Sequence, residues 1–200
     1  MKTSIWMGVA LLGGIGWTPA VRGCERVLED VAICVGDNIS LFVASHAQTK
    51  ASAIFRQIGI HLKWHSADSA FCRKTSHPKI EVTYSLKTAE QAYPGAFAYA
   101  MPYEGVHIEV FYDRIRGKTD LGVSHVLAHV LAHEISHILQ GNDRHADSGI
   151  MKARWDKADF AQMENGNLPF GNEDVLKMRG NLPAWANRAQ PATFAPSAKP

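Results

Sequence analysis

The order of apolar and polar residues along the first half of the chain follows two patterns. Short runs with strand-like alternation or β-branched apolar residues occur at 31–35, 60–64, 80–86 and 106–115. Helical spacing instead runs from Leu41 to Ile58, and Gly59 follows where that helix would end. A stretch rich in glycine, alanine and proline at 93–105 indicates loops around a short strand near Phe97.

The second half begins with the longest helical pattern of the chain, at about 120–140, which Gly141 would end. Beyond Trp155 the pattern weakens, and one further helix is predicted at 173–179. A strand, a helix, several strands and then a long helix follow one another. This order predicts a single domain over residues 21–187, which we class as α+β.

The two ends of the chain differ in composition from this domain. Residues 1–20 combine Lys2, an apolar stretch of thirteen residues and small residues around Ala20, which is typical of a cleaved signal peptide. The stretch is short for a membrane span, and the alternative is a buried first helix. We therefore expect a secreted or periplasmic protein, with lipid attachment at Cys24 as the less favoured form of export. Residues 188–200, rich in alanine and proline, are expected to form a disordered tail.

Composition narrows the classes of partner. Hydrophobic residues make up 46% of the 200-residue chain and the formal net charge is +2, so neither nucleic acid nor a membrane surface is expected as a partner. The oligomeric state is not indicated. If the chain is exported, we expect one disulfide among Cys24, Cys34 and Cys72, and all three pairings stay open.

Candidate chemistry is concentrated in the long helix, in the segment HVLAHVLAHEISH. Histidine recurs there at every fourth residue, and neighbours at that spacing share one helix face. His133, Glu134 and His137 form the pattern H-E-x-x-H, in which two imidazoles bind one zinc ion and the acid takes a proton from a zinc-activated water. The pair His129–His133 lacks the acid, because Val130 stands at the equivalent position.

A catalytic zinc site usually has three protein ligands and one open position, so a third ligand is expected. Gly141 lets the backbone leave the helix and turn back, which brings His145 within reach of the metal. Asp143 and Asp147 are the alternatives, because zinc also accepts carboxylate oxygen. Met151, in the segment SGIM, can form a turn beneath the site.

The stretch HEISHILQGNDRH…SGIM resembles the metzincin clan of zinc peptidases, whose motif is H-E-x-x-H-x-x-G-x-x-H followed by a methionine-containing turn. The resemblance implies that His133, His137 and His145 are the zinc ligands. It implies in the same way that Glu134 is the general base and that Met151 is the turn methionine. The match covers about twenty residues. It departs from the motif, because the glycine comes one residue late and the third histidine two residues late. The loop between them must therefore bulge.

The resemblance also implies a fold and a mode of substrate binding. We expect a metzincin-like zincin with a small mixed sheet, a backing helix and an active-site helix. An extended peptide substrate would add to the strand at 106–115, taken as an edge strand. A tyrosine could stabilise the oxyanion, and the candidates are Tyr99, Tyr103 and Tyr112.

The sequence thus predicts an exported zinc metallopeptidase that hydrolyses peptide bonds and uses Zn²⁺ as its cofactor. One alternative is a gluzincin-type peptidase with Glu164 or Glu173 as the third ligand. A second is a zinc-stabilised binding domain without activity. A third is a hydrolase of small molecules or of the cell wall that uses the same zinc chemistry. The pattern indicates no preference among peptide substrates.

Overall fold

The computed structural model describes residues 29–187, except 75–76, 90, 92, 101–105 and 117–119. The predicted signal peptide, Cys24, Tyr103 and the predicted tail lie outside the described residues. Within the part of the chain that the structure describes, no helix has the length and apolar character needed to span a membrane.

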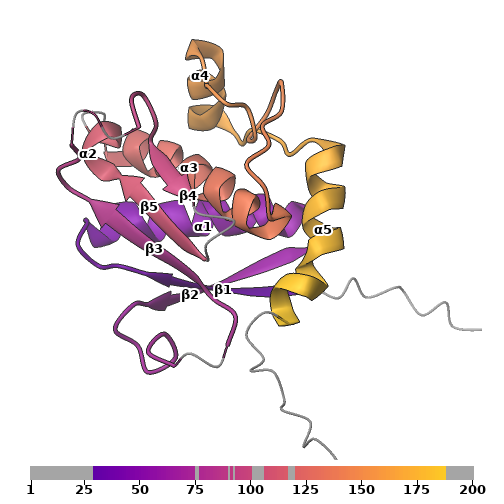
Figure 1. Cartoon of the computed structure of the whole chain (residues 1–200). Helices are drawn as coiled ribbons and strands as arrows, with labels where there is room; N and C mark the ends of the chain where they lie inside the picture. The colour runs from indigo at the N-terminus through magenta and orange to yellow at the C-terminus, as the bar shows by residue number, and fades with distance from the viewer. Residues whose placement is uncertain are drawn as a thin grey trace, which may run out of the picture.

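A five-stranded mixed sheet forms the centre of the fold (Figure 1). In spatial order its strands are β2 (Ile60–Ser66), β1 (Glu29–Val35), β3 (Ile80–Ser85), β5 (His107–Phe111) and β4 (Ala98–Ala100). The pairs β1–β2, β1–β3 and β3–β5 are parallel, whereas β4 runs antiparallel to β5. The predicted α+β class with a small mixed sheet is confirmed.

The prediction of an edge strand at 106–115 is wrong in two respects: the strand ends earlier, and it does not lie at the edge of the sheet. The last four residues of this range form a short helix, α2 (Tyr112–Ile115). The Asp113 carboxylate accepts hydrogen bonds from the N–H and the hydroxyl group of Thr88, at 2.9 and 2.7 Å. These bonds hold α2 against the segment that follows β3. β5 itself lies between β3 and β4, so the edge strand on that side is β4, next to Phe97.

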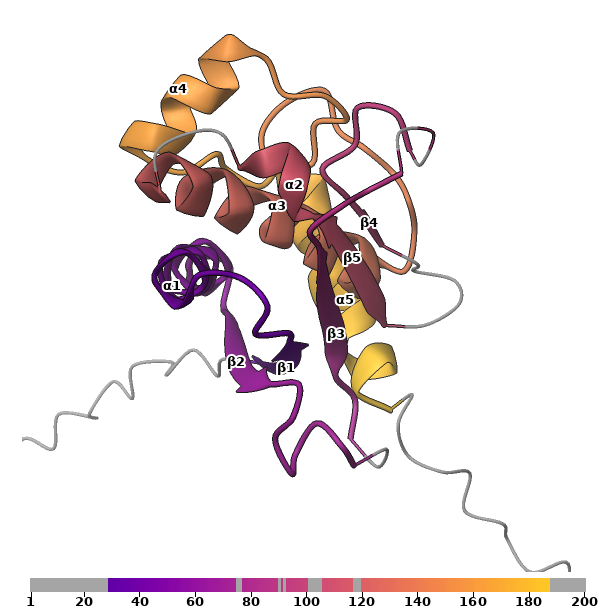
Figure 2. The same ribbon diagram turned by 90° about the vertical axis from the view of Figure 1, so that its left-hand side faces the viewer.

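Two long helices, α1 (Leu41–Gln57) and α3 (Asp120–Gln140), lie side by side along the sheet (Figures 1 and 2). Both match the predicted ranges closely. Almost every described side chain of α3 is buried, and this includes the polar residues Ser124, Ser136 and Gln140. The helix is covered by α1, by the sheet and by the two helices that follow it, which explains why it lacks the polar stripe of a surface helix.

Helix α4 (Lys157–Asn165) was not predicted. A start signal is nevertheless present in the sequence, since Asp156 and Asp159 form a reciprocal capping box at its first turn. The helix that follows this cap is short and mostly polar, so the spacing of its apolar residues did not indicate a helix.

Helix α5 (Asn172–Asn187) is longer than the predicted 173–179 and continues through Pro183. Its second half packs on α3, and the Asn181 side chain donates a hydrogen bond to the carbonyl oxygen of Leu139 at 2.8 Å. Tertiary contacts therefore extend a helix that local propensity would end earlier.

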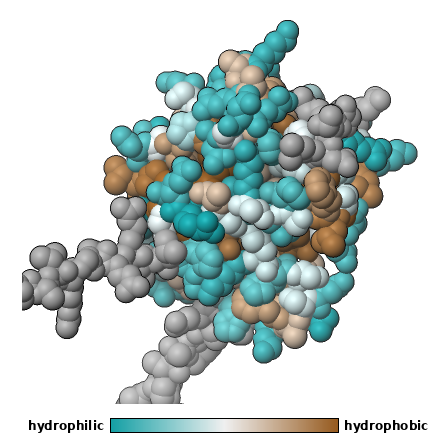
Figure 3. Space-filling model, turned by 180° about the vertical axis from the view of Figure 1, so that it is seen from behind, coloured by the Kyte–Doolittle hydropathy of each residue, from teal (hydrophilic) through white to brown (hydrophobic). Residues whose placement is uncertain are grey.

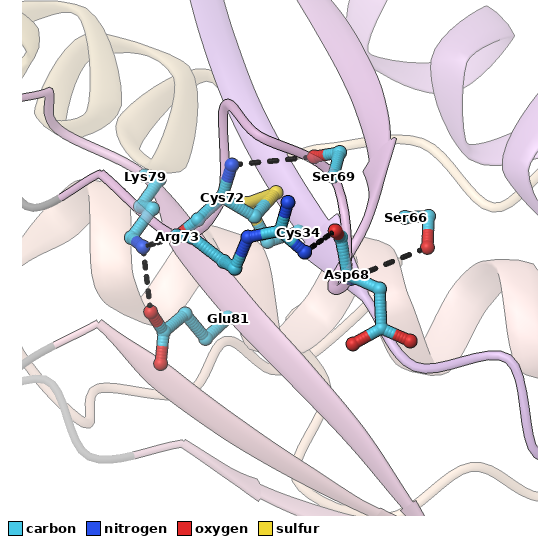
Figure 4. Close-up of a disulfide and its surroundings, with 8 residues drawn as sticks. All are labelled: Cys34, Ser66, Asp68, Ser69, Cys72, Arg73, Lys79 and Glu81. Carbon is cyan, nitrogen blue, oxygen red and sulfur yellow. Dashed lines mark hydrogen bonds and ion pairs between the residues drawn. A yellow bond between two sulfur atoms is a disulfide. The ribbon is translucent and has the colours of Figure 1, made fainter.

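A disulfide joins Cys34, in β1, to Cys72 in the loop after β2, with the Cα atoms 5.9 Å apart (Figure 4). Of the three pairings left open by the sequence, the structure contains this one. The ammonium group of Lys79 bonds to the carbonyl oxygen of Cys72 and forms an ion pair with Glu81 at 3.1 Å. These contacts attach the loop to both β1 and β3.

The face opposite to that of Figure 1 carries hydrophilic and hydrophobic residues side by side (Figure 3). The two most exposed large apolar side chains of the described chain, Leu41 and Leu176, lie on different helices, α1 and α5.

Candidate metal centre and active site

Three histidine side chains meet at the second half of α3. His133 and His137 lie one turn apart on the helix, and His145 lies in the loop that follows it. One nitrogen atom from each ring lies within 4.8 Å of the others, and the Nε2 atoms of His133 and His137 are 3.0 Å apart. Among the described residues, this cluster has the geometry to hold a metal ion.

Backbone carbonyl groups fix the orientation of the first two rings. His133 donates from Nδ1 to the carbonyl oxygen of Ile150 at 2.8 Å, and His137 donates from Nδ1 to that of Asn142 at 3.0 Å. A carbonyl oxygen only accepts, so the proton is on Nδ1 and each Nε2 carries a lone pair. Two lone pairs facing each other repel, whereas a cation between them would be bound by both. With the third imidazole they offer three nitrogen donors, the kind of donor set that catalytic zinc sites use.

Both buried rings are neutral at physiological pH. Burial lowers the pKa of His133 to about 3 and that of His137 to about 4, and the neighbouring imidazoles add to both shifts. Neutral imidazole is the form that binds metals, so His133 and His137 are in their metal-binding form at pH 7.

The loop after α3 accommodates a spacing longer than that of the metzincin motif. Gly141 ends the helix with a φ of 67°, a conformation that glycine adopts without strain. The Asn142 side chain then accepts a hydrogen bond from the N–H of Arg144 at 3.1 Å, which closes a tight turn. The longer segment is thus taken up in a compact turn.

The Arg144 side chain attaches this loop to α5. Its Nη1 donates to Oδ1 of Asp174 at 3.0 Å, and Asp174 is 1% exposed. The next residue, His145, has its ring centroid 5.2 Å from that of His133 and 4.9 Å from that of His137. The exposed His145 ring therefore meets the two buried rings from the solvent side.

Glu134 borders the cluster and is almost fully buried. Burial raises the pKa of its carboxyl group to about 8, while a hydrogen bond from the N–H of Ala100, in β4, acts in the opposite direction. A carboxyl group with a pKa near neutrality can accept a proton and release it again. Glu134 thus has the properties of a general acid–base group.

A cavity of about 380 Å³ opens beside the cluster, between α3, the segment leading into β4 and the segment leading into α4. Residues of the candidate site border it: His133, Glu134 and His145. Phe97, Trp155 and Phe160 line its apolar side, with ring centroids 6.2 Å apart for Phe97–Phe160 and 6.4 Å for Trp155–Phe160. The cavity therefore has a polar, chemically active side and an aromatic side.

The turn at 149–151 supplies the carbonyl oxygen that orients the first histidine. Met151 is fully buried, and its carbonyl oxygen accepts a hydrogen bond from the N–H of Ala146 at 2.7 Å. Gly149 has a φ of 74°, and a Cβ atom there would collide with the carbonyl oxygen of Pro169. The turn is therefore tightly packed.

Neither a family model nor a curated protein matches the chain. Among solved structures, archaemetzincin from Methanopyrus kandleri is similar, with a TM-score of 0.53 and 11% identity over 82% of this chain and 99% of its own. A zinc-dependent peptidase from Methanocorpusculum labreanum gives a TM-score of 0.55 and 11% identity over 74% of this chain and 99% of its own. The chain has the archaemetzincin fold.

Within the archaemetzincin fold, the structure brings the main sequence-predicted residues together. The cluster contains His133, His137 and His145. Glu134 lines the adjoining cavity, and Met151 lies in the adjoining turn. Their roles as ligands, general base and turn methionine stay predictions.

The alternative ligands lie outside the group of converging ligand atoms in the described chain: Asp143, Asp147, Glu164 and Glu173. Glu173 forms ion pairs with Arg144 and Lys177 instead. Of the tyrosines considered for the oxyanion, neither Tyr99 nor Tyr112 lines the cavity.

Sequence reasoning missed the aromatic side of the cavity, formed by Phe97, Trp155 and Phe160. Phe97 lies nearly sixty residues before Trp155 and Phe160, so only the folded chain brings it to them. The one available signal was a tryptophan in polar surroundings, four residues after Met151.

Proposed function

We propose that this protein is an exported zinc metallopeptidase. His133, His137 and His145 hold the zinc ion, and Glu134 is the general base. One observation carries the proposal: two unprotonated Nε2 atoms converge at 3.0 Å, beside a buried carboxyl group and an open cavity. The fold shared with an archaemetzincin and with a zinc-dependent peptidase supports it.

The chemistry follows from the donor set and the carboxyl group. A zinc ion in this site would act as a Lewis acid toward water and toward a peptide carbonyl group. Glu134 takes a proton from water and passes it to the leaving amine, because its pKa lies near neutrality. The hydrogen bond from the Ala100 N–H holds this carboxyl group at the edge strand.

The edge strand β4 supports a mode of substrate binding. Ala98 in this strand lines the cavity, so an extended peptide paired with β4 would run past Glu134. The aromatic side of the cavity would then receive a large apolar side chain of that peptide. We therefore propose peptides with a bulky apolar residue beside the scissile bond as substrates.

Arg154 adds a positive charge to the same cavity. The nearby Lys152 is already engaged, because it forms ion pairs with Asp156 and Asp159, each at 2.7 Å. Arg154 lines the cavity, is exposed and has no ion pair within the described residues. A carboxylate on the substrate, from its C-terminus or from an acidic side chain, would meet this guanidinium group.

Export is part of the proposal and rests on two features. Residues 1–20 have the pattern of a signal peptide. The Cys34–Cys72 disulfide is of a kind that persists in oxidising compartments. Both features support a secreted or periplasmic location.

The alternatives have less support. A gluzincin-type site needs Glu164 or Glu173 among the converging ligand atoms of the described chain, and neither is there. A purely structural zinc site has no use for a buried Glu134 at an open cavity. A hydrolase of small molecules or of the cell wall would share the zinc chemistry, and a substrate screen separates it from a peptidase.

The test compares the purified chain with His145→Ala and Glu134→Gln. We expect about one zinc ion in the wild type and in Glu134→Gln, and loss of zinc in His145→Ala. Peptide hydrolysis should fall about 10²–10⁴-fold in Glu134→Gln, because the general base is gone. His125→Ala, on the same helix but outside the cluster, should keep both zinc and activity. Tight zinc binding by His145→Ala would remove the ligand assignment, and undiminished hydrolysis by Glu134→Gln would remove the base.

A further inference from the structure

His129 lies one turn before His133 on α3 and is fully buried, yet it does not belong to the metal cluster. A buried polar ring costs free energy unless both of its nitrogen atoms have partners. Both have one. Nδ1 lies 2.7 Å from the carbonyl oxygen of His125, and Nε2 lies 3.1 Å from the backbone nitrogen of Leu168.

These two partners fix the tautomer of His129. The carbonyl oxygen can only accept and the N–H can only donate, so Nδ1 carries the proton and Nε2 the lone pair. The first bond stays within α3, because it joins residues four positions apart. The second leaves the helix and reaches the segment between α4 and α5, 39 residues further along the chain.

From Leu168 a path of hydrogen bonds returns to the metal centre. The carbonyl oxygen of Pro169, the next residue, accepts from the N–H of Ile150 at 2.9 Å. The carbonyl oxygen of Ile150 in turn accepts from Nδ1 of His133 at 2.8 Å. The path therefore leaves α3 at His129 and rejoins it at His133, one turn later.

The segments along this path are tightly packed. Leu168 is 2% exposed, and Ile150 is fully buried. Gly149 has no side chain, at the point where a Cβ atom would collide with the carbonyl oxygen of Pro169. A displacement of residues 168–169 would therefore move the Ile150 carbonyl group, because the intervening backbone has no free space to absorb it.

We propose that His129 is a positioning residue for the metal centre. By holding Leu168, it keeps the carbonyl oxygen of Ile150 where that atom orients the ring of His133. The proposal rests on the proposed function, because it takes His133 as a metal ligand. It also gives the repeated HVLAH pattern of α3 a physical meaning, since one histidine supports the site and the next forms it.

Two substitutions separate positioning from a purely structural role. His129→Leu removes the acceptor for the Leu168 N–H, whereas the amide oxygen of His129→Gln can replace that acceptor. Leu127→Ala is the matched control, because it is buried on the same helix and weakens the core without a part in the path. For each chain we measure the zinc dissociation constant by chelator competition, the visible spectrum of the cobalt-substituted protein, and the stability of the metal-free protein in denaturant.

We expect His129→Leu to weaken zinc binding about tenfold or more and to change the cobalt spectrum. His129→Gln should recover most of the affinity, and Leu127→Ala should lose stability but keep the wild-type affinity and spectrum. Wild-type affinity and spectrum in His129→Leu would overturn the proposal, as would an equal loss of affinity in Leu127→Ala. A wild type that binds no zinc would overturn the proposed function itself, and this proposal with it.

If His129→Leu does not fold, hydrogen exchange in the wild type, with and without zinc, tests the positioning role instead. Because coupling between two sites is reciprocal, zinc binding to the wild type should slow hydrogen exchange at the amides of Ile150 and Leu168 more than at amides of β1. Equal slowing at both places, or none at Leu168, would overturn the positioning role.

Discussion

The Nδ1 atom of His133 lies 2.8 Å from the carbonyl oxygen of Ile150, although 17 positions separate the two residues. This bond joins the middle of α3 to the turn that contains Met151. It fixes the direction of Nε2 before a metal ion arrives, so binding requires little rearrangement of the ring. His137 is held in the same way by the carbonyl oxygen of Asn142. Backbone groups of two loops thus preorganise the candidate metal centre.

Acid should destabilise the metal-free protein. Burial lowers the pKa of His133 to about 3, and those of His129 and His137 to about 4. Below about pH 6.5 the unfolded state binds these protons and the folded state does not. The stability present above pH 6.5 is therefore lost as the pH falls toward 4, by up to about 1.4 kcal/mol per pH unit for each ring.

Urea denaturation of metal-free protein at about pH 7 and about pH 5 measures this loss. Glu134 acts in the opposite sense, because its raised pKa keeps a proton on the folded state between about 4.5 and 8. The measurement is therefore made in the Glu134→Gln background, which removes that contribution. Equal stability at the two pH values would contradict the neutral, buried state of the three rings.

Gly149→Ala should destabilise the protein more than Gly95→Ala. Both glycines have a positive φ, 74° and 79°, so the backbone strain of the substitution is similar. A Cβ atom at position 149 would collide with the carbonyl oxygen of Pro169, whereas at position 95 it would meet nothing within 4 Å. We expect about 1 kcal/mol for Gly95→Ala and a further 1–3 kcal/mol or so for Gly149→Ala, from denaturation curves. Equal losses would mean that the turn can move away from Pro169.

Trp155→Ala should reduce the preference for large apolar side chains. The indole ring lies 5.7 Å from the ring of His133, and its Nε1 donates to the carbonyl oxygen of Gly149 at 3.3 Å. We expect KM for a peptide with phenylalanine beside the scissile bond to rise about 10- to 100-fold, and KM for the matching alanine peptide to change little. Phe42→Ala, an exposed aromatic residue on α1, should change neither. Parallel changes for both peptides would remove the aromatic side of the cavity from substrate recognition.

Arg154→Glu should reverse a preference for negatively charged peptides. Wild type should favour the charged member of each of two peptide pairs, free carboxylate over C-terminal amide and aspartate over asparagine, by about tenfold for one charge-assisted hydrogen bond. If wild type distinguishes the first pair, Arg154 binds the C-terminal carboxylate of the substrate; if it distinguishes the second, Arg154 binds an acidic side chain. Lys157→Glu, exposed and outside the cavity lining, should leave the preference unchanged. If wild type does not distinguish either pair, Arg154 has no part in specificity.

Local sequence patterns predicted the ranges of α1 and α3 and the residue at which α3 ends. α3 ends where expected because Gly141 adopts a positive φ at that point. His133 and His137 could be paired from the sequence because helix geometry alone places residues four apart on one face. Glu134 was singled out by the same motif, and its burial against β4 agrees with a role at the site.

The remaining features depend on contacts between distant segments. α5 passes through Pro183 because Leu182 and Trp185 are buried in the core. The internal position of β5 follows from the order of strands, and alternation of apolar residues gives no information about that order. The aromatic side of the cavity joins Phe97, before β4, to Trp155 and Phe160, before and within α4. The hydrogen bond from Trp155 to the Gly149 carbonyl oxygen in the preceding turn holds the indole ring there.

The ion pair between Arg144 and Asp174 makes the third candidate ligand depend on the last described helix. Arg144 precedes His145 directly, and its partner is a buried carboxylate in the first turn of α5. Metal occupancy and the docking of α5 on α3 are then linked equilibria, because an ion that orders the His145 loop also favours the docked helix. We therefore expect proteolytic removal of α5 to weaken metal binding although none of the candidate ligands is removed, and we expect the metal-loaded protein to resist that cleavage.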